Sequence, residues 1–217
     1  MERAVALAFG QVLLAVGFGY AGMAGAVVLW TSLAGRPLGF DAREAAFFLS
    51  VGVTTFAITW AAGDRPFRRS LALAWPQDRR IAIWFGAALA AVLAVEAAVA
   101  LSGLLGSLEE MKAMSSSERS ALGLANAVLL APVVEELLFR GQLFTTLRRH
   151  LAVLPALAVT TIAFGLLHLE NGLLHVVSVL PAGAFLGYAR ELSGGIGLPI
   201  LLHACMNAAV ILAGLLL

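Results

Sequence analysis

Charged residues and cysteine are both scarce in this sequence. Only 12% of its 217 residues are charged, whereas 61% are hydrophobic and the mean hydropathy is +0.94. Water-soluble domains contain about a quarter charged residues, so this composition excludes an ordinary soluble domain. The single cysteine, Cys205, excludes an internal disulfide and a four-thiolate metal site. The net charge is +1 and no basic tract is present, so nothing indicates nucleic-acid binding.

The sequence contains several long apolar runs. Several of them reach the roughly 20 residues that a helix needs to cross the hydrocarbon core of a bilayer. The sequence therefore predicts an all-α polytopic membrane protein, with about seven transmembrane helices in one bundle and a single domain over residues 1–217. The predicted spans are residues 5–30, 44–62, 81–105, 120–144, 151–168, 173–190 and 196–216.

The distribution of arginine predicts the orientation in the membrane. The short link between the second and third spans carries Arg65, Arg68, Arg69, Arg79 and Arg80. Such arginine-rich links are retained on the cytoplasmic side. Counting spans from there places the N-terminus inside and the polar link 106–119 outside. We therefore predict a multi-pass protein of the cell inner membrane.

A few polar and ionisable side chains nevertheless lie inside the predicted spans. A charge at the centre of a membrane helix costs about 2.5–3.5 kcal/mol on insertion scales, so such residues are functional candidates. The set comprises Glu96, Glu135, Glu136, Arg140, His168, His203 and Asn207. Glu96 has no motif around it, and helix packing is the simplest interpretation of its presence.

Helical spacing sorts these candidates. Glu136 and Arg140 are four residues apart, so they lie on one helix face and neutralise each other. Glu135 is rotated by about 100° from its neighbour and must face across the bundle. His203 and Asn207 share a face for the same reason. The sequence thus predicts one cavity with a carboxylate, two imidazoles and an amide, from Glu135, His168, His203 and Asn207.

This set of groups suits two kinds of chemistry. A buried carboxylate can act as general base on a water molecule, and a neighbouring imidazole can orient that water. A second imidazole and an amide N–H can stabilise the oxyanion of a tetrahedral intermediate, which is worth roughly 2.7–4 kcal/mol for one donor. Two histidines and a glutamate can equally hold zinc with an open coordination position. Spacing alone does not separate these alternatives.

Three short motifs resemble those of a known family. "EELLFR" at 135–140 fits an EExxxR motif, "FGLLH" at 164–168 fits FxxxH, and "HACMN" at 203–207 fits HxxxN. Between them, Gly183 and Gly187 have small-xxx-small spacing. The sequence resembles the CPBP family of intramembrane proteases, also called Abi or Rce1-like, type II CAAX prenyl endopeptidases. The resemblance covers about residues 120–210, which we take as the protease core.

The resemblance implies a role for each matched residue. Glu135 would activate the water with the help of His168, while His203 and Asn207 would form the oxyanion hole. The supporting residues would be Glu136, Arg140 and Phe164, the last of which shapes the cavity. Well-understood members resemble glutamate-dependent enzymes, so no catalytic metal is implied, although zinc stays open on the residues alone.

The resemblance does not fix the substrate. Some members remove the last three residues of prenylated proteins, others are linked to bacteriocin immunity, and the myxosortases resemble processors of C-terminal sorting helices. The arginine-rich, lysine-poor composition is typical of a high-GC bacterium, where prenylated substrates are not expected. We predict an intramembrane endopeptidase that acts on the C-terminal region of membrane-anchored or exported proteins, with the lipid bilayer and such a protein as its partners.

Other functions use the same residues. The main alternative is a non-catalytic membrane binding protein of the bacteriocin-immunity type with the same fold. A haem protein with His168 and His203 as axial ligands is a second alternative. A proton-coupled transporter is a third, although no internal repeat supports it.

Overall fold

The computed structural model describes residues 2–62, 66–102 and 120–216, and within these ranges it contains helices and no strands. The long helices are α1 (Glu2–Ala34), α2 (Phe40–Ala61), α4 (Arg79–Ser102), α9 (Val153–Leu167), α10 (Leu173–Ser193) and α11 (Gly197–Leu216). Two short elements are α3 (Phe67–Ser70) and η3 (Leu169–Asn171). A continuous helical rod consists of α6 (Ala121–Ala125), η1 (Asn126–Leu130), α7 (Ala131–Glu136), η2 (Leu137–Leu143) and α8 (Phe144–Leu147).

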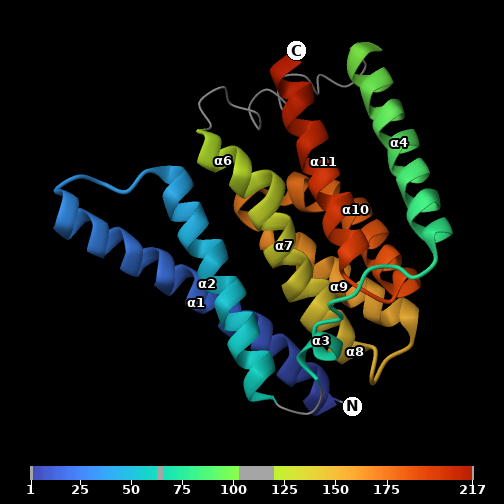
Figure 1. Ribbon diagram of the computed structural model, residues 1–217, viewed down its shortest axis with the longest axis horizontal. Coiled ribbons are helices and arrows are strands. Elements are labelled where there is room, and N and C mark those ends of the chain that lie inside the picture. Colours follow the sequence, from blue (N-terminus) through green and yellow to red (C-terminus); the bar gives the residue numbers. More distant parts are fainter. Residues whose placement is uncertain (1, 63–65, 103–119, 217) are drawn as a thin grey trace.

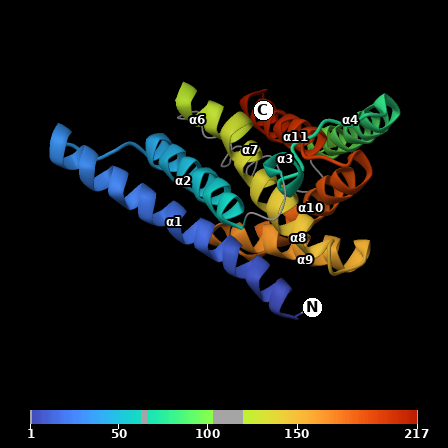
Figure 2. The same cartoon turned by 60° about the horizontal axis from the view of Figure 1, so that its bottom comes forward.

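This rod, from residue 121 to 147, is the centre of the bundle. In Figures 1 and 2 the α1–α2 hairpin lies on one side of it and α4 lies on the opposite side, next to α11. Its apolar side chains, among them Leu138, Phe139 and Leu143, form one buried cluster with residues of α1, α2 and α9. In the most apolar stretch of the rod 56% of residues are buried, against 17% in each of α1 and α2. The two outer helices therefore have most of their surface free to face lipid.

The helices agree with the predicted spans, each of which coincides with a helix to within a few residues. Within the described residues, three stretches are long and apolar enough to cross a membrane: Val5–Ala34, Phe40–Ala61 and Ala121–Leu147. Shorter apolar helices cover Val153–Leu167 and Gly197–Ala213. The chain is a multi-pass membrane protein, while the count of seven spans stays a prediction. The polar link 106–119 and Arg65 lie outside the described residues, and of Glu96 only the backbone, in α4, is described.

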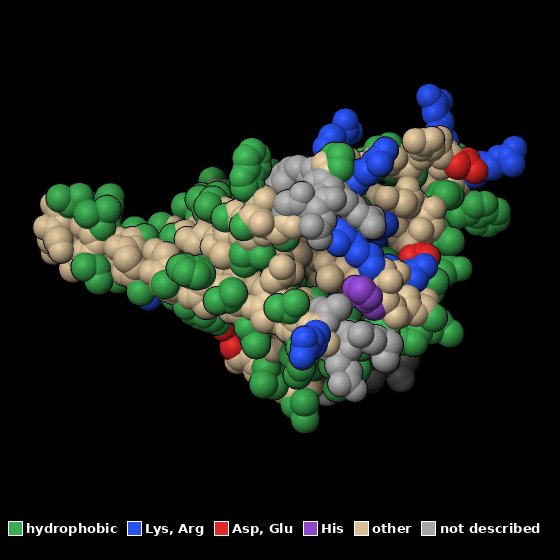
Figure 3. All heavy atoms as spheres, turned by 90° about the horizontal axis from the view of Figure 1, so that it is seen from below, with side chains coloured by type: hydrophobic (Ala, Val, Ile, Leu, Met, Phe, Trp, Pro, Cys, Tyr) green, Lys and Arg blue, Asp and Glu red, His purple; other side chains and the backbone are tan. Residues whose placement is uncertain are grey.

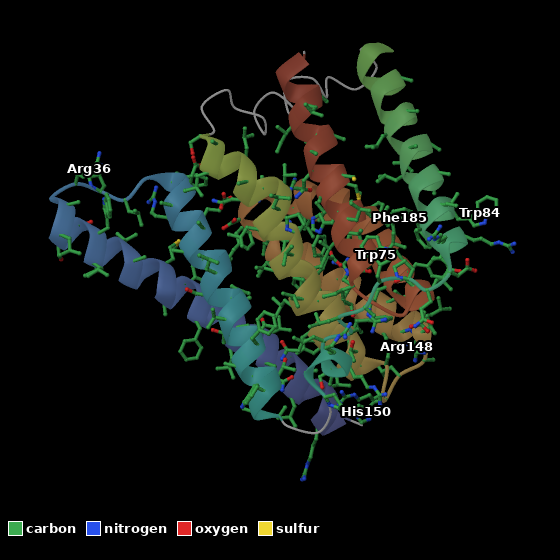
Figure 4. The ribbon with its side chains drawn as sticks, in the orientation of Figure 1. Arg36, Trp75, Trp84, Arg148, His150 and Phe185 are labelled. Atoms are coloured by element: carbon green, nitrogen blue, oxygen red, sulfur yellow. The ribbon has the colours of Figure 1, made fainter. Side chains whose placement is uncertain are left out.

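Basic side chains gather at one end of the bundle. The short helix α3 contains Arg68 and Arg69, and it lies at the same end as the N-terminus and α8. Figure 3, seen from this end, shows several arginine side chains on the surface. Arg148 lies here too, whereas Arg36 lies at the far tip of the α1–α2 hairpin (Figure 4). The clustering suits one membrane face, and which face it is stays a prediction.

Two π-helical segments interrupt the central rod. In η1, the Ala131 N–H donates to the carbonyl of Asn126, five residues back. In η2, the Phe144 N–H likewise donates to the carbonyl of Phe139. Single π turns of this kind are rare and occur frequently at functional sites. They flank α7, whose last two residues are Glu135 and Glu136.

A partly buried segment, residues 71–74, follows α3, where sequence analysis predicts only a link between spans. We call this segment the hook. Leu71 is fully buried, and Ala72 adopts a positive φ of 50°. The carbonyl of Ala72 accepts a hydrogen bond from the Ile196 N–H at 3.0 Å, and that of Ala74 accepts one from the Gly197 N–H at 3.0 Å. The prediction missed this hook because its anchoring contacts are backbone pairs with residues far away in the sequence. The hook fixes the point at which α11 begins.

Replacing Gly195 with alanine should destabilise the protein. A Cβ there would overlap the backbone carbonyl of Ala74, which cannot rotate away as a flexible side chain could. Overpacking of this kind costs about 1–3 kcal/mol. Thermal unfolding in detergent should show a lower midpoint for Gly195→Ala. Gly86→Ala is the matched control, because a Cβ at Gly86 would meet nothing within 4 Å. An unchanged midpoint for Gly195→Ala would contradict the hook's anchoring role.

Candidate active site

Three charged side chains occupy the core where α7 meets η2. Glu136 and Arg140 are fully buried, and Glu135 is 8% exposed. The Nη1 of Arg140 lies 2.8 Å from the Oε1 of Glu136, so the predicted ion pair between them is confirmed. Pairing and hydrogen bonding are the conditions under which buried charges are tolerated. Glu135, on the neighbouring helix face, is left out of this pair.

His203 of α11 contacts both glutamates. Its Nδ1 lies 3.0 Å from the Oε1 of Glu136, and its Nε2 lies 3.8 Å from the Oε2 of Glu135. A carboxylate only accepts hydrogen bonds, so Nδ1 carries the proton that is donated to Glu136. Glu136 thereby orients the ring so that Nε2 faces Glu135. Sequence analysis predicted the Glu136–Arg140 pair but did not predict that Glu136 also binds His203.

Arg140 is held from several directions. Its Nη2 donates to the backbone carbonyl of Gly183 in α10 at 2.7 Å. Its guanidinium carbon lies 4.6 Å from the centre of the Phe164 ring, in cation–π geometry. The Phe164 ring also lies 4.9 Å from the ring of His168 and 5.9 Å from that of His203. The Phe164 ring therefore lies against both histidines, and its cavity-shaping role stays a prediction.

Close approach of α10 and α9 depends on the two glycines with small-xxx-small spacing. A Cβ at Gly183 would lie 3.1 Å from the Cδ1 of Phe164, and a Cβ at Gly187 would lie 2.8 Å from the Cδ2 of Leu157. Both distances are shorter than ordinary van der Waals contact. The absence of a side chain at Gly183 lets its carbonyl reach the Arg140 guanidinium.

His168 lies just after the end of α9. Its Nδ1 is 3.0 Å from the carbonyl oxygen of Phe164. Because a carbonyl oxygen only accepts, Nδ1 is the donor, and the Nε2 of the neutral ring has a free lone pair. His168 is also close enough to Glu135 for the two to interact electrostatically. The ring of His175, in the first turn of α10, lies 5.6 Å from that of His168.

The side chain of Asn207 binds the backbone of η1 rather than the charged cluster. Its Nδ2 donates to the carbonyl of Ala127 at 2.8 Å. That carbonyl lacks its α-helical donor, since the Ala131 N–H binds Asn126 instead. The next N–H along would come from Pro132, which has none. Asn207 thus satisfies a carbonyl that the π turn and the proline leave free, and its oxyanion role stays a prediction.

The described ranges contain no group of three or more His, Cys, Asp or Glu side chains placed to hold a metal ion. Cys205, next to the motif histidine, is exposed. The geometry brings Glu135, Glu136, Arg140, Phe164, His168 and His203 together. Sequence analysis missed the Gly183 carbonyl, for which a sequence carries no signal. Pro132 inside a predicted span was a usable signal for the π turn, because proline breaks the helical hydrogen-bond ladder.

Comparison with known proteins identifies a family. Residues 117–209 match the family model "Type II CAAX prenyl endopeptidase Rce1-like". No curated protein and no solved structure gives a significant match. The matched segment includes the central rod and every motif residue described above. This segment of the chain, residues 117–209, is therefore similar to the type II CAAX prenyl endopeptidase Rce1-like family of membrane proteases.

Proposed function

We propose that this protein is a glutamate-dependent intramembrane endopeptidase with Glu135 as its general base. The observation that supports the proposal is the different bonding of the two adjacent carboxylates, Glu135 and Glu136. Glu136 is bound to Arg140 and His203, whereas no hydrogen bond to Glu135 is found among the described residues. A carboxylate that has no hydrogen-bond partner in a mostly enclosed site is available to take a proton from water.

The hydrolysis follows from these positions. Glu135 removes one proton from water, while the lone pair on the Nε2 of His168 accepts a hydrogen bond from the other O–H and so orients the nucleophile. The water oxygen then attacks the peptide carbonyl carbon and forms a tetrahedral oxyanion. Collapse of this intermediate breaks the C–N bond, and the proton held by Glu135 passes to the departing amine. Water is consumed, and one carboxylate and one amine are formed.

His203 is assigned to the oxyanion. Its Nδ1–H is donated to Glu136, and this contact turns its Nε2 towards Glu135 and the site. An Nε2–H directed towards the site can donate to the developing negative charge. Asn207 can add a second donor if its amide turns away from the Ala127 carbonyl. In this assignment Glu136 and Arg140 hold the imidazole ring in place.

The substrate is proposed to be the C-terminal region of a membrane-anchored or exported protein, processed in the cell inner membrane. Mass spectrometry of protein C-termini, in cells with the wild-type chain or Glu135→Ala, tests this directly. We expect a set of proteins to retain a hydrophobic tail only in the mutant cells. Identical C-termini, together with full rescue of a knockout phenotype by Glu135→Ala, would instead indicate a non-catalytic binding protein.

Chelation provides a separate test of the mechanism. A glutamate-activated water needs no metal ion, so the cleavage rate should stay within about twofold after dialysis against EDTA or 1,10-phenanthroline. The measurement is cleavage of a peptide that spans a site found in the C-terminus comparison. Loss of activity that added zinc restores would replace this mechanism with the zinc alternative.

A further inference from the structure

The π turn in η2 changes the backbone hydrogen bonding of Arg140, the residue whose side chain neutralises Glu136. In an α-helix the carbonyl of Arg140 would accept from the Phe144 N–H, four residues on. Here the Phe144 N–H donates to Phe139 instead. The Arg140 carbonyl is thereby released from its α-helical partner, and in a buried region such a group needs another one.

Two side chains supply the missing donors. The hydroxyl of Thr145 donates to the Arg140 carbonyl at 3.3 Å. The Nε of Arg190, in α10, donates to the same oxygen at 3.3 Å. The Nη2 of Arg190 donates to the Thr145 hydroxyl oxygen at 3.2 Å and closes the triangle. The Arg190 guanidinium also lies over the ring of Phe144, at 5.8 Å from its centre.

α10 therefore binds both the side chain and the backbone of Arg140. The Gly183 carbonyl accepts from its guanidinium, and Arg190 donates to its backbone carbonyl. Gly183 and Arg190 are separated by two helical turns and lie on the same face of α10. The position of Arg140 along the central rod is thus fixed relative to α10 rather than by the rod alone.

We propose that Arg190 and Thr145 are positioning residues, which lock the η2 turn so that Arg140 meets Glu136 and Glu136 orients His203. This inference rests on the proposed protease function. Neither residue belongs to the motifs that the sequence resembles. The neighbouring cation Arg148 has a different task, because it forms a bidentate pair with Glu191 at 3.0 Å for both bonds. If Arg190 served only to set the orientation of the chain in the membrane, its positive charge would be enough. Its contact with Thr145 would then not be needed.

The test compares variants that remove or keep the donors. Thr145→Val has almost the same shape without the hydroxyl, and Thr145→Ser keeps the hydroxyl. Arg190→Gln removes the guanidinium. Glu191→Gln is the matched control, since it disturbs the adjacent pair with Arg148 and leaves the Arg140 carbonyl untouched.

Hydrogen exchange gives a readout that does not depend on a substrate. In detergent, a peptide covering 137–147 should exchange about tenfold faster in Thr145→Val and Arg190→Gln, because the turn opens locally more often. Thr145→Ser and Glu191→Gln should match the wild type. Equal exchange in all four variants would overturn the proposal, whether or not the protein is a protease.

Measuring kcat and KM distinguishes a positioning role of Thr145 from a general contribution to stability. With a peptide from the C-terminus comparison, Thr145→Val should lower kcat about tenfold and leave KM unchanged. In an Arg140→Lys background the same substitution should cost nothing further, since it acts through Arg140. Independent, multiplying losses would overturn the inference while the proposed function stands. A wild type no more active than Glu135→Ala would remove the proposed function, and the exchange result would still decide the role of the turn.

Discussion

Glu135→Gln should reduce kcat by about 10²–10⁴, the range that a positioned general base contributes, and should leave the fold intact. Glutamine has the same shape as glutamate and cannot take a proton from water. Glu135 lies 3.8 Å from His203 and forms no hydrogen bond within the described part of the chain, so its removal breaks no strong contact. Stability should stay equal or rise, as is common when a catalytic charge in a desolvated site is removed.

Turnover of a peptide from the C-terminus comparison and thermal unfolding in detergent measure the two sides of this prediction. Glu170→Gln is the matched control, because Glu170 is an exposed carboxylate in η3, immediately beyond the same end of α9 as His168. It should leave both quantities unchanged. If Glu135→Gln retains turnover within tenfold of the wild type, another group is the base and the assignment fails.

Sequence reasoning identified the elements of this site because membrane helices leave few alternatives. Charges in apolar spans are expensive, so Glu135, Glu136 and Arg140 could be singled out without a structure. The four-residue spacing then predicted that Glu136 pairs with Arg140, and the pair is present at 2.8 Å. The small-xxx-small spacing of Gly183 and Gly187 is typical of closely packed helices, and α9 does approach α10 closely at Gly183. These features depend on local geometry, which a regular helix fixes.

Most of the features that sequence reasoning missed, the Glu136–His203 contact apart, depend on backbone atoms. A carbonyl belongs to every residue, so nothing marks Gly183 as the acceptor for Arg140 or Ala127 as the acceptor for Asn207. The π turns shift the helical register and release the carbonyls of Ala127 and Arg140, which a uniform 3.6-residue period cannot predict. The Ala72 hook escaped for a similar reason, because its partner lies near the start of α11.

The π turns and the buried charges are connected. Each turn flanks the α7 segment that carries the glutamates, and each released carbonyl is taken by a side chain from α10 or α11. Both helices also bind the charged cluster, through the Gly183 carbonyl and His203. Irregular backbone is tolerated at membrane depth only where protein groups satisfy it. The same two helices thus fix the rod and the side chains whose orientation the proposed chemistry needs.

Arg140→Met should destabilise the protein more than Gly195→Ala does. It leaves the fully buried Glu136 without its cation and the Gly183 carbonyl without its donor. Breaking one partner out of a buried ion pair costs about 3–5 kcal/mol. Unfolding in mixed micelles with increasing SDS measures this free energy. Arg148→Met is the matched control, since the Arg148–Glu191 pair is 30% and 25% exposed and such pairs contribute about 0–1 kcal/mol.

A double substitution separates charge balance from catalysis. Glu136→Gln together with Arg140→Met removes both buried charges, so most of the lost stability should return. Activity should not return, because the Arg140 guanidinium that holds residue 136, and through it the His203 ring, is lost. Stability and turnover should therefore separate in the double variant. If both recover, the pair only balances charge, and if neither recovers, the loss lies in the contacts of Arg140 with Gly183 and Phe164 rather than in an unpaired carboxylate.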